Sequence, residues 1–368
     1  MFDEHVGPLR GVIYAVAEHQ FLAELMKALV KYASGNGHVE IREVAEPVCR
    51  DDEVKIEVGF CGVCGTDLHV LHDTFRNYPP VILGHELSGT VVEAGPLARG
   101  VPIGQRVAVL GATSVTCGEC EHCRSGYFIF CPRRRGMGHG VNGGFARYVA
   151  ARPDQLYPIP DAMTLEEGAL SEPFAAIVQA VIEIGRVNPG ETAVVSGPGP
   201  MGLLCLKLLV AEGVRTIVAG TAADRERLEA ARRFGALAVV DVESGDLAAT
   251  VREATCGRGA DVSFECAGHP ASVRGCLESL RPMGRHIQVA ICGRDISFKI
   301  DRVFYKQLTM AGSVCYTAAT WARMFQIFAD GRVSLADLVS HTLPISEWQT
   351  AFDLVVNRRS LKVLMRPV

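Results

Sequence analysis

The stretch Ala193-Val-Val-Ser-Gly-Pro-Gly-Pro-Met-Gly202 decides the fold of one half of this chain. A short apolar run of strand character enters a turn with three glycines, and a leucine-rich helical pattern follows. The first glycine of such a turn makes the bend, the second lets a pyrophosphate approach the backbone, and the third allows close helix packing. Amides at the helix N-terminus favour phosphate. We therefore predict a dinucleotide-binding turn formed by Gly197, Gly199, Pro200, Met201 and Gly202.

From about Glu172 onward, strand and helix patterns alternate regularly, which predicts βαβ units and a parallel sheet. A helix is expected from Arg225 to Phe234. Further strands are expected at 216–220, 260–266, 286–291 and 362–365, and further helices at 321–329 and 346–356. Before that shift, the segment from Lys27 to Gly59 alternates between apolar and polar residues, which is typical of strands with one buried face.

The residues after the second strand bear on the choice of cofactor. A site for NAD places an acidic residue about 20 positions beyond the glycine turn, where it binds the ribose 2′-hydroxyl. Ala222 stands at that position, so we expect a preference for NADP, with Arg225 as the cation for its 2′-phosphate. Arg227 is a further candidate. Asp224 has two possible roles. It is either the acid that binds the ribose 2′-hydroxyl in place of Ala222 or the cap of the following helix.

Two upstream segments carry metal-ligand side chains beside glycine. Cys61-Gly-Val-Cys-Gly-Thr-Asp-Leu-His69 is followed, after a loop, by Gly84-His85-Glu86. Cysteine sulfur, histidine nitrogen and carboxylate oxygen suit zinc, and a catalytic zinc has three protein ligands and one open position. The third ligand is expected far downstream, at Glu172, with Glu86 as the local alternative.

A second group of cysteines has the spacing of a structural zinc site. Two residues separate the first from the second and the second from the third, and seven separate the third from the fourth. The four are Cys117, Cys120, Cys123 and Cys131. Four thiolates on one loop close a tetrahedral site and leave no position for substrate. Paired disulfides are the alternative, and the close spacing disfavours them.

Composition excludes several other classes of protein. The 368 residues are enough for two domains, and 48% hydrophobic with 21% charged residues is typical of a globular protein with large cores. A net charge of -4 without a long basic run gives no indication of a nucleic-acid partner. No apolar run reaches the length of a membrane span. Thirteen cysteines, an odd number, and no visible secretion signal favour the reducing cytoplasm.

Together these motifs resemble the zinc-dependent medium-chain dehydrogenase/reductase family, in the family's order and over nearly all of residues 26–368. The resemblance is closer to polyol and threonine dehydrogenases, because Ser171-Glu172-Pro173 places glutamate where liver-type alcohol dehydrogenases have cysteine. It implies an α/β fold in which a Rossmann doubly wound parallel sheet is inserted in a GroES-like, mostly β catalytic domain. The expected boundaries are 26–175 for the catalytic domain with its structural zinc lobe, 176–315 for the dinucleotide domain and 316–368 for the return to the catalytic domain.

The resemblance also implies ligands for both metals. Catalytic zinc is expected on Cys64, His85 and Glu172, with Glu86 as an occasional ligand. The four-cysteine lobe is similar to the family's structural zinc site. Residues 1–25 precede Met26, which looks like the usual family start. We interpret them as an N-terminal extension, either an added helix or, as we favour, the product of a wrongly assigned start codon.

The implied reaction is oxidation of a secondary alcohol, such as a polyol, sugar alcohol or amino-alcohol, to a ketone by hydride transfer to NAD or NADP. Zinc acts as a Lewis acid on the hydroxyl, and Thr66 and His69 are candidates for a proton relay. Thr66 has a second interpretation, as the cap of a helix that begins at Asp67. Polyol-type relatives also imply a homodimer or homotetramer.

Two departures leave the substrate subgroup open. Sorbitol dehydrogenases often have an aromatic residue directly after the relay histidine and arginine before a pocket tyrosine, whereas this chain has Val70 and Cys315, the latter before Tyr316. Two other functions are alternatives. One is a catalytically silent protein that binds zinc and nucleotide, and the other is a zinc-free quinone reductase of the same fold. The complete ligand set argues against both.

Overall fold

A computed structural model describes residues 24–367 of the chain. The predictions for residues 1–25 therefore lie almost wholly outside the described residues. A seven-stranded sheet is built from both ends of the chain, and its strand order is β15-β16-β3-β5-β6-β8, with β7 also paired to β3. Its strands are β3 (Val54–Gly62), β5 (Glu86–Ala94), β6 (Arg106–Val109), β7 (Tyr148–Ala151), β8 (Leu156–Pro158), β15 (Val339–Pro344) and β16 (Lys362–Arg366).

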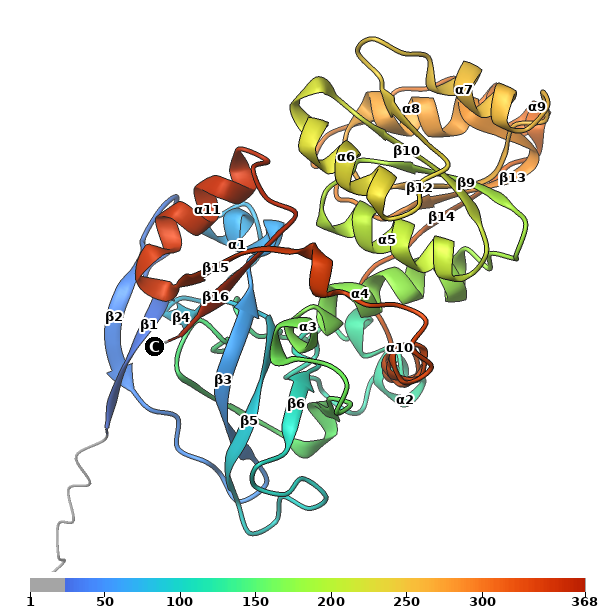
Figure 1. The fold of residues 1–368 in the computed structure, drawn as a ribbon. Helices are drawn as coiled ribbons and strands as arrows, with labels where there is room; N and C mark the ends of the chain where they lie inside the picture. The colour runs from blue at the N-terminus through green and yellow to red at the C-terminus, as the bar shows by residue number, and fades with distance from the viewer. Residues whose placement is uncertain (1–23, 368) are drawn as a thin grey trace, which may run out of the picture.

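The last strand lies directly beside an early one. β16 runs antiparallel to β3, with Leu364 opposite Gly62, and Figure 1 shows the two in red and blue side by side. A small three-stranded sheet flanks this part of the molecule in the order β2-β1-β4. Its strands are β1 (Leu25–Lys31), β2 (Val39–Ala45) and β4 (Val81–Ile82).

The second part is a six-stranded parallel sheet in the order β11-β10-β9-β12-β13-β14. The chain starts at β9 in the middle, winds outward to one edge and then to the other, which makes the sheet doubly wound. Its strands are β9 (Thr192–Ser196), β10 (Arg215–Gly220), β11 (Ala238–Asp241), β12 (Ala260–Glu265), β13 (Leu280–Gln288) and β14 (Thr309–Gly312). The predicted α/β fold class is confirmed.

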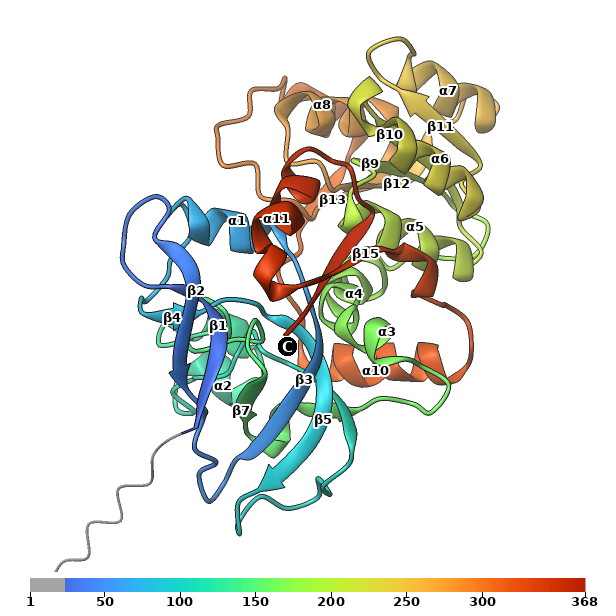
Figure 2. The ribbon, with the colours of Figure 1, turned by 60° about the vertical axis from the view of Figure 1, so that its left-hand side comes forward.

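Alternation along β9 sends its side chains into two different cores. Ala193 and Val195 join the cluster that contains α4, α5 and α10, whereas Val194 joins the cluster that contains α7 and α8. Successive side chains of a strand point to opposite faces, so helices cover both faces of this sheet (Figures 1 and 2). The covering helices are α5 (Pro200–Ala211), α6 (Arg225–Arg233), α7 (Leu247–Ala254), α8 (Pro270–Ser279) and α9 (Asp301–Lys306). Behind α5 lies α4 (Ser171–Val178), and α10 (Ala318–Ala329) packs against α4.

The remaining helices lie mainly in the first part. They are α1 (Gly65–Leu71), α2 (Glu121–Arg124), α3 (Leu165–Ala169) and α11 (Trp348–Val356), together with a π-helical continuation of α4 (Gln179–Ile184) and 3-10 turns at Phe128–Phe130, Pro153–Gln155, Ala222–Asp224, Ala336–Leu338 and Ile345–Glu347. Within residues 24–367, no helix combines the length and the apolar character that crossing a bilayer requires.

Three predicted elements differ from the structure by two residues or more, and the strand expected at 286–291 already begins at Leu280. The strand expected at 286–291 ends at Gln288, because the amides of Val289 and Ala290 both turn to the Glu265 carbonyl at 3.0 Å. The helix expected at 321–329 starts at Ala318, since the Thr317 hydroxyl accepts from the Thr320 amide and caps it. The helix expected at 346–356 starts at Trp348 after a 3-10 turn.

Candidate functional site

The expected catalytic residues Cys64 and His85 meet beside Glu86. Strands β3 and β5 pair in a register that sets Gly62 opposite Glu86, so the residues just beyond β3 and just before β5 lie together. One ligand atom each from Cys64, His85 and Glu86 falls in a group in which all atoms lie within 4.8 Å of one another. A thiol, an imidazole and a carboxylate at this spacing fit a zinc ion.

Asp67 orients this group, although it was not among the predicted site residues. Its Oδ2 accepts from the Cys64 amide at 2.9 Å, and its Oδ1 lies 3.6 Å from His85 Nδ1. Burial lowers the pKa of His85, but the charges of Asp67 and Cys64 raise it well above its ordinary value. The same negative charges favour a metal cation. Metal-bound histidine usually places its other ring nitrogen against a carboxylate, as His85 does here.

His85 Nδ1 is also a buried nitrogen with no hydrogen-bond partner among the described residues. A buried polar atom without a partner is unfavourable and needs an explanation. The Asp67 Oδ1, 3.6 Å away, faces Nδ1 from just beyond hydrogen-bonding distance. The donor set and this unpaired atom both fit a bound metal.

Glu86 forms a buried ion pair with a residue from the far end of the chain. Lys362 Nζ contacts Glu86 Oε2 and donates to the Val63 carbonyl at 3.0 Å, and both charged side chains are almost fully buried. Burial lowers the pKa of Lys362, while the Glu86 carboxylate raises it above its ordinary value. Lys362 lies on β16 and carries no motif, so nothing in the sequence pointed to this pairing.

Glu172 lies in the first turn of α4, near this group but outside it. Its Oε1 accepts from the Tyr316 hydroxyl at 2.8 Å. Burial raises the pKa of Glu172, with His85 opposing and Glu86 adding to that effect, which places its carboxylate within electrostatic reach of both. Tyr316 was noted in the sequence only as a pocket position, and the structure shows that it orients Glu172.

The two relay candidates lie on α1. Thr66 Oγ1 is 3.7 Å from Cys64 Sγ, whereas the His69 ring pairs with Thr74 Oγ1 at 3.0 Å. Thr66 is half-buried and His69 is exposed, so the pair runs from the metal-ligand group toward solvent. The interpretation of Thr66 as a helix cap was wrong, because α1 begins at Gly65 and Cys64 occupies the cap position.

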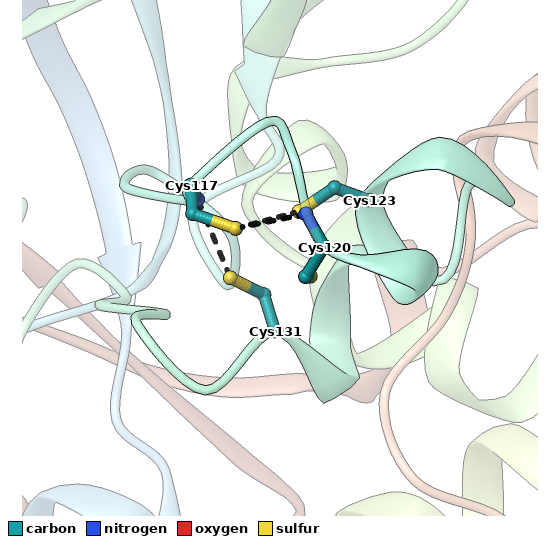
Figure 3. Close-up of side chains that lie close together, drawn as sticks. All are labelled: Cys117, Cys120, Cys123 and Cys131. Atoms are coloured by element: carbon teal, nitrogen blue, oxygen red, sulfur yellow. Dashed lines mark hydrogen bonds between the residues drawn. The ribbon is translucent and has the colours of Figure 1, made fainter.

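The four-cysteine lobe brings its sulfurs together, as Figure 3 shows. The sulfurs of Cys117 and Cys123 are 3.9 Å apart, and the Cys117 amide donates to Cys131 Sγ at 3.3 Å. Amides at Cys120 and Glu119 lower the pKa of Cys117 to about 6. All thirteen cysteines have free thiols, so the disulfide alternative is not what the structure shows. Four sulfurs from one loop fit a closed zinc site.

The glycine turn has the geometry that a dinucleotide needs. Gly197 has a φ of +102°, which a residue with a side chain rarely adopts, and a Cβ at Gly202 would lie 1.9 Å from the Gly197 carbonyl oxygen. Around Gly199 the space is open, with Arg227 Nη1 as the nearest atom at 4.0 Å from an added Cβ. Pro200 and Met201 begin α5. A cleft of about 1000 Å³ opens beside the turn, lined by Ser196, Gly197 and the ends of β10, β11 and β12.

Of the residues predicted to lie near the ribose, only some line this cleft. Asp224 lines it, together with Thr221 and Arg358, whereas Ala222 and Arg225 face a separate depression with Glu229 and Arg232. Ala222 also donates its amide to Glu243 Oε2 at 3.1 Å, so a carboxylate from the end of β11 reaches the position where the usual acid is missing.

Asp224 and Arg227 connect the two parts of the molecule. Asp224 stands at the cap position of α6, but its carboxylate accepts from the amide and hydroxyl of Thr221 at 3.1 and 2.9 Å instead of from helix amides, which corrects the capping interpretation. Arg358 Nη1 donates to the same carboxylate at 3.2 Å. Buried Arg227 donates to the Ser360 carbonyl at 2.9 Å. Both contacts join α6 to the loop before β16.

Two family models match this chain, one over each part of the fold. Residues 50–161 match the alcohol dehydrogenase GroES-like domain, and residues 200–330 match the zinc-binding dehydrogenase domain. The chain belongs to the zinc-dependent medium-chain dehydrogenases. The predicted family and its enzymatic character are confirmed, and a silent binding protein is disfavoured.

Individual relatives of this dehydrogenase cover almost its whole length. A sorbitol dehydrogenase of Halalkalibacterium halodurans is 35% identical, over 93% of this chain and 100% of that protein. A D-arabitol-phosphate dehydrogenase of Enterococcus avium is 32% identical, over 94% and 98%. Among solved structures, a zinc-binding dehydrogenase of Sinorhizobium meliloti with bound NADP has a TM-score of 0.84 at 30% identity, over 94% and 100%.

The buried pair of Lys362 and Glu86 gives a first test of this site. Substitution Lys362→Met should lower the free energy of unfolding of the dehydrogenase by about 3–5 kcal/mol, because it leaves a buried carboxylate without its cation. Urea denaturation measures the change, with exposed Lys299→Met as the matched control. Adding Glu86→Gln to Lys362→Met should recover much of the loss. A double variant as unstable as the single one would contradict this account.

Proposed function

We propose that this dehydrogenase oxidises a secondary alcohol of the polyol class to a ketone, with NADP as the hydride acceptor. The observation that carries the proposal is the group of Cys64, His85 and a carboxylate, whose histidine is already directed toward Asp67. The names of relatives support the substrate class, since they include dehydrogenases of sorbitol and arabitol phosphate. Val70 and Cys315 leave the particular polyol open.

The side chains around the metal-ligand group have distinct roles in this proposal. Zinc bound there supplies a Lewis acid that lowers the pKa of an alcohol hydroxyl. Asp67 holds the ring of His85, and Tyr316 holds the carboxylate of Glu172. Thr66 is near enough to Cys64 to hydrogen-bond a substrate hydroxyl, and His69 accepts the proton at the exposed end of α1. A nicotinamide cofactor bound at the glycine turn would supply the hydride acceptor, and the protein contributes position and field.

We infer that Glu172 is the resting third ligand and that Glu86 is an occasional one. Glu86 belongs to the close group, but Lys362 neutralises its charge and competes for Oε2. The Glu172 carboxylate is held only by a neutral hydroxyl, which leaves its charge available to a cation. Hard cations and zinc bind most strongly to ligands that are deprotonated and not already paired.

We expect two zinc ions per chain, measured by elemental analysis of protein purified without chelators. Cys64→Ser should retain one zinc and lose alcohol-dependent reduction of NAD and NADP, with little change in stability. Cys120→Ser should also retain one zinc, but should lower the midpoint of thermal unfolding, because structural zinc contributes folding energy.

Cys256→Ser is the matched control, since that thiol is exposed and lies outside both groups. It should keep both metals and full turnover. One zinc or none in the unsubstituted protein would overturn the two-site proposal. Failure of sorbitol, arabitol, threonine and simple secondary alcohols to reduce either cofactor would overturn the proposed activity.

For the cofactor, we propose that Arg358, and not Arg225, meets the 2′-phosphate of NADP. Arg358 lines the cleft with about half of its side chain exposed, and it reaches the cleft from the loop before β16. Asp224 is already bonded to Thr221 and to Arg358, so its charge is largely neutralised. Glu243 near Ala222 opposes a phosphate and is the competing influence.

Arg358→Ala should therefore reduce kcat/KM for NADP by about 10- to 100-fold and change kcat/KM for NAD much less, since a hydrogen bond to a charged group contributes roughly 1.5–3 kcal/mol. Arg225→Ala is the matched control on the neighbouring depression and should affect both cofactors alike. Unsubstituted enzyme that prefers NAD, and that loses this preference in Glu243→Gln, would show instead that Glu243 replaces the missing acid.

We also propose a cytoplasmic homodimer or homotetramer. β14 ends the parallel sheet, which leaves one strand edge for pairing, and Met310 on that strand is 40% exposed. Free thiols throughout fit a reducing compartment. Light scattering that gives the mass of a single chain would refute the assembly.

A further inference from the structure

Three arginines close to the candidate site have no carboxylate partner among residues 24–367. They are Arg76, Arg134 and Arg135, and none takes part in an ion pair, whereas Arg106 and Arg147 of the same domain do. Arg76 and Arg135 both lie against the ring of Tyr78, with guanidinium carbons 5.2 and 4.2 Å from its centre. Like charges gathered in this way repel one another when no anion is present.

The backbone that carries these arginines packs directly against the metal-ligand segment. A Cβ on Gly138 would lie 3.0 Å from backbone atoms of Gly84, which precedes His85. The Tyr78 amide donates to the His139 carbonyl at 2.8 Å, which joins the segment of Arg76 to the segment of Arg134. Both segments are therefore fixed beside His85.

Arg134 lies close enough to His139 and Cys315 for its positive charge to lower the pKa of each. It is half-buried, and its Nη1 donates to the Ala112 carbonyl at 2.8 Å. Ala112 also has a backbone contact with the Tyr316 hydroxyl, which in turn binds Glu172. A guanidinium has five N–H donors, and only one hydrogen bond of Arg134 is formed within the described chain. Its remaining donors are free to bind an anion.

The surrounding titratable groups leave the charge of Arg134 without compensation. Burial, His85 and Arg134 together lower the pKa of His139 to about 4, so His139 is neutral at pH 7. Burial raises the pKa of Cys315 to about 12, so that thiol is also neutral. Arginine keeps its charge at any working pH. The acids of the metal-ligand site do not pair with Arg134, because Asp67 lies against His85, Glu86 pairs with Lys362, and Glu172 is the proposed zinc ligand.

We propose that Arg134 binds the phosphate of a phosphorylated polyol, and that Arg76 and Arg135 extend the positive charge along the path by which it enters. The inference rests on the proposed function and narrows its substrate class from polyols to their phosphate monoesters. A dianion matches several guanidinium groups better than a carboxylate with a single charge does, and planar bidentate contacts favour arginine for this task. The chain as a whole has a net charge of -4, so this cluster of positive charge is opposite in sign to the net charge of the protein.

The test compares kcat/KM for D-arabitol 5-phosphate, D-arabitol and the carboxylate D-arabinonate, each with NADP and with NAD. The unsubstituted enzyme should favour the phosphate ester by more than about 10-fold. Arg134→Ala should raise KM for the ester by about 10- to 100-fold, as expected for a lost charged hydrogen bond. Its kcat/KM for D-arabitol should stay the same. The KM of Arg134→Lys for the ester should lie between the values of the unsubstituted enzyme and of Arg134→Ala.

Arg76→Ala and Arg135→Ala should have smaller effects on the ester that disappear at high salt, because they act at longer range. Both side chains are exposed, so these variants test the charge even if Arg134→Ala folds poorly. Arg99→Ala is the matched control, an exposed arginine beyond the far end of β5.

Oxidation of D-arabitol as efficiently as its phosphate, preference for D-arabinonate, or equal losses on ester and free polyol in Arg134→Ala would each overturn this inference. The first of these outcomes would leave the proposed polyol oxidation standing. Failure to oxidise any polyol or polyol phosphate would instead overturn the proposed function itself.

Discussion

The buried pairing of Lys362 with Glu86 is the constraint on which the rest of the catalytic part depends. It joins the final strand to the strand that follows His85, although the two residues are separated by about three-quarters of the chain. Gly62 has to be glycine for this to happen, since a Cβ there would lie 2.1 Å from Glu86 Oε2. The pair thus fixes the register of β3, β5 and β16, and that register brings Cys64 to His85.

The features that the sequence predicted well are those encoded locally. The glycine turn carries its own strand, bend and helix within ten residues, and the four cysteines lie within fifteen residues of one another. Their geometry follows from short-range constraints, which one sequence contains in full. Cys64 and His85 were also identifiable because glycines flank them in two short motifs.

Residues supplied from distant segments could not be found in this way. Lys362 and Arg358 are single positions near the C-terminus, and they acquire a role only when β16 lies beside β3. Arg225 was expected at the ribose because it follows Ala222 in sequence, yet the short 3-10 turn at Ala222–Asp224 directs it to the other side. Where the chain turns within three residues, two residues that are close in sequence can point their side chains to opposite sides.

The four-cysteine lobe has almost no core of its own. Between residues 117 and 131 only Cys123 and Cys131 are buried, while Tyr127 and Phe130 each expose about half of their surface. Its shape therefore depends on sulfur chemistry and hardly on hydrophobic burial. Thiolates with a lowered pKa, such as Cys117, are the form that oxidants attack. Oxidation of these thiols would therefore remove the ligands that hold the lobe in shape, although it would leave the hydrophobic cores of both sheets intact.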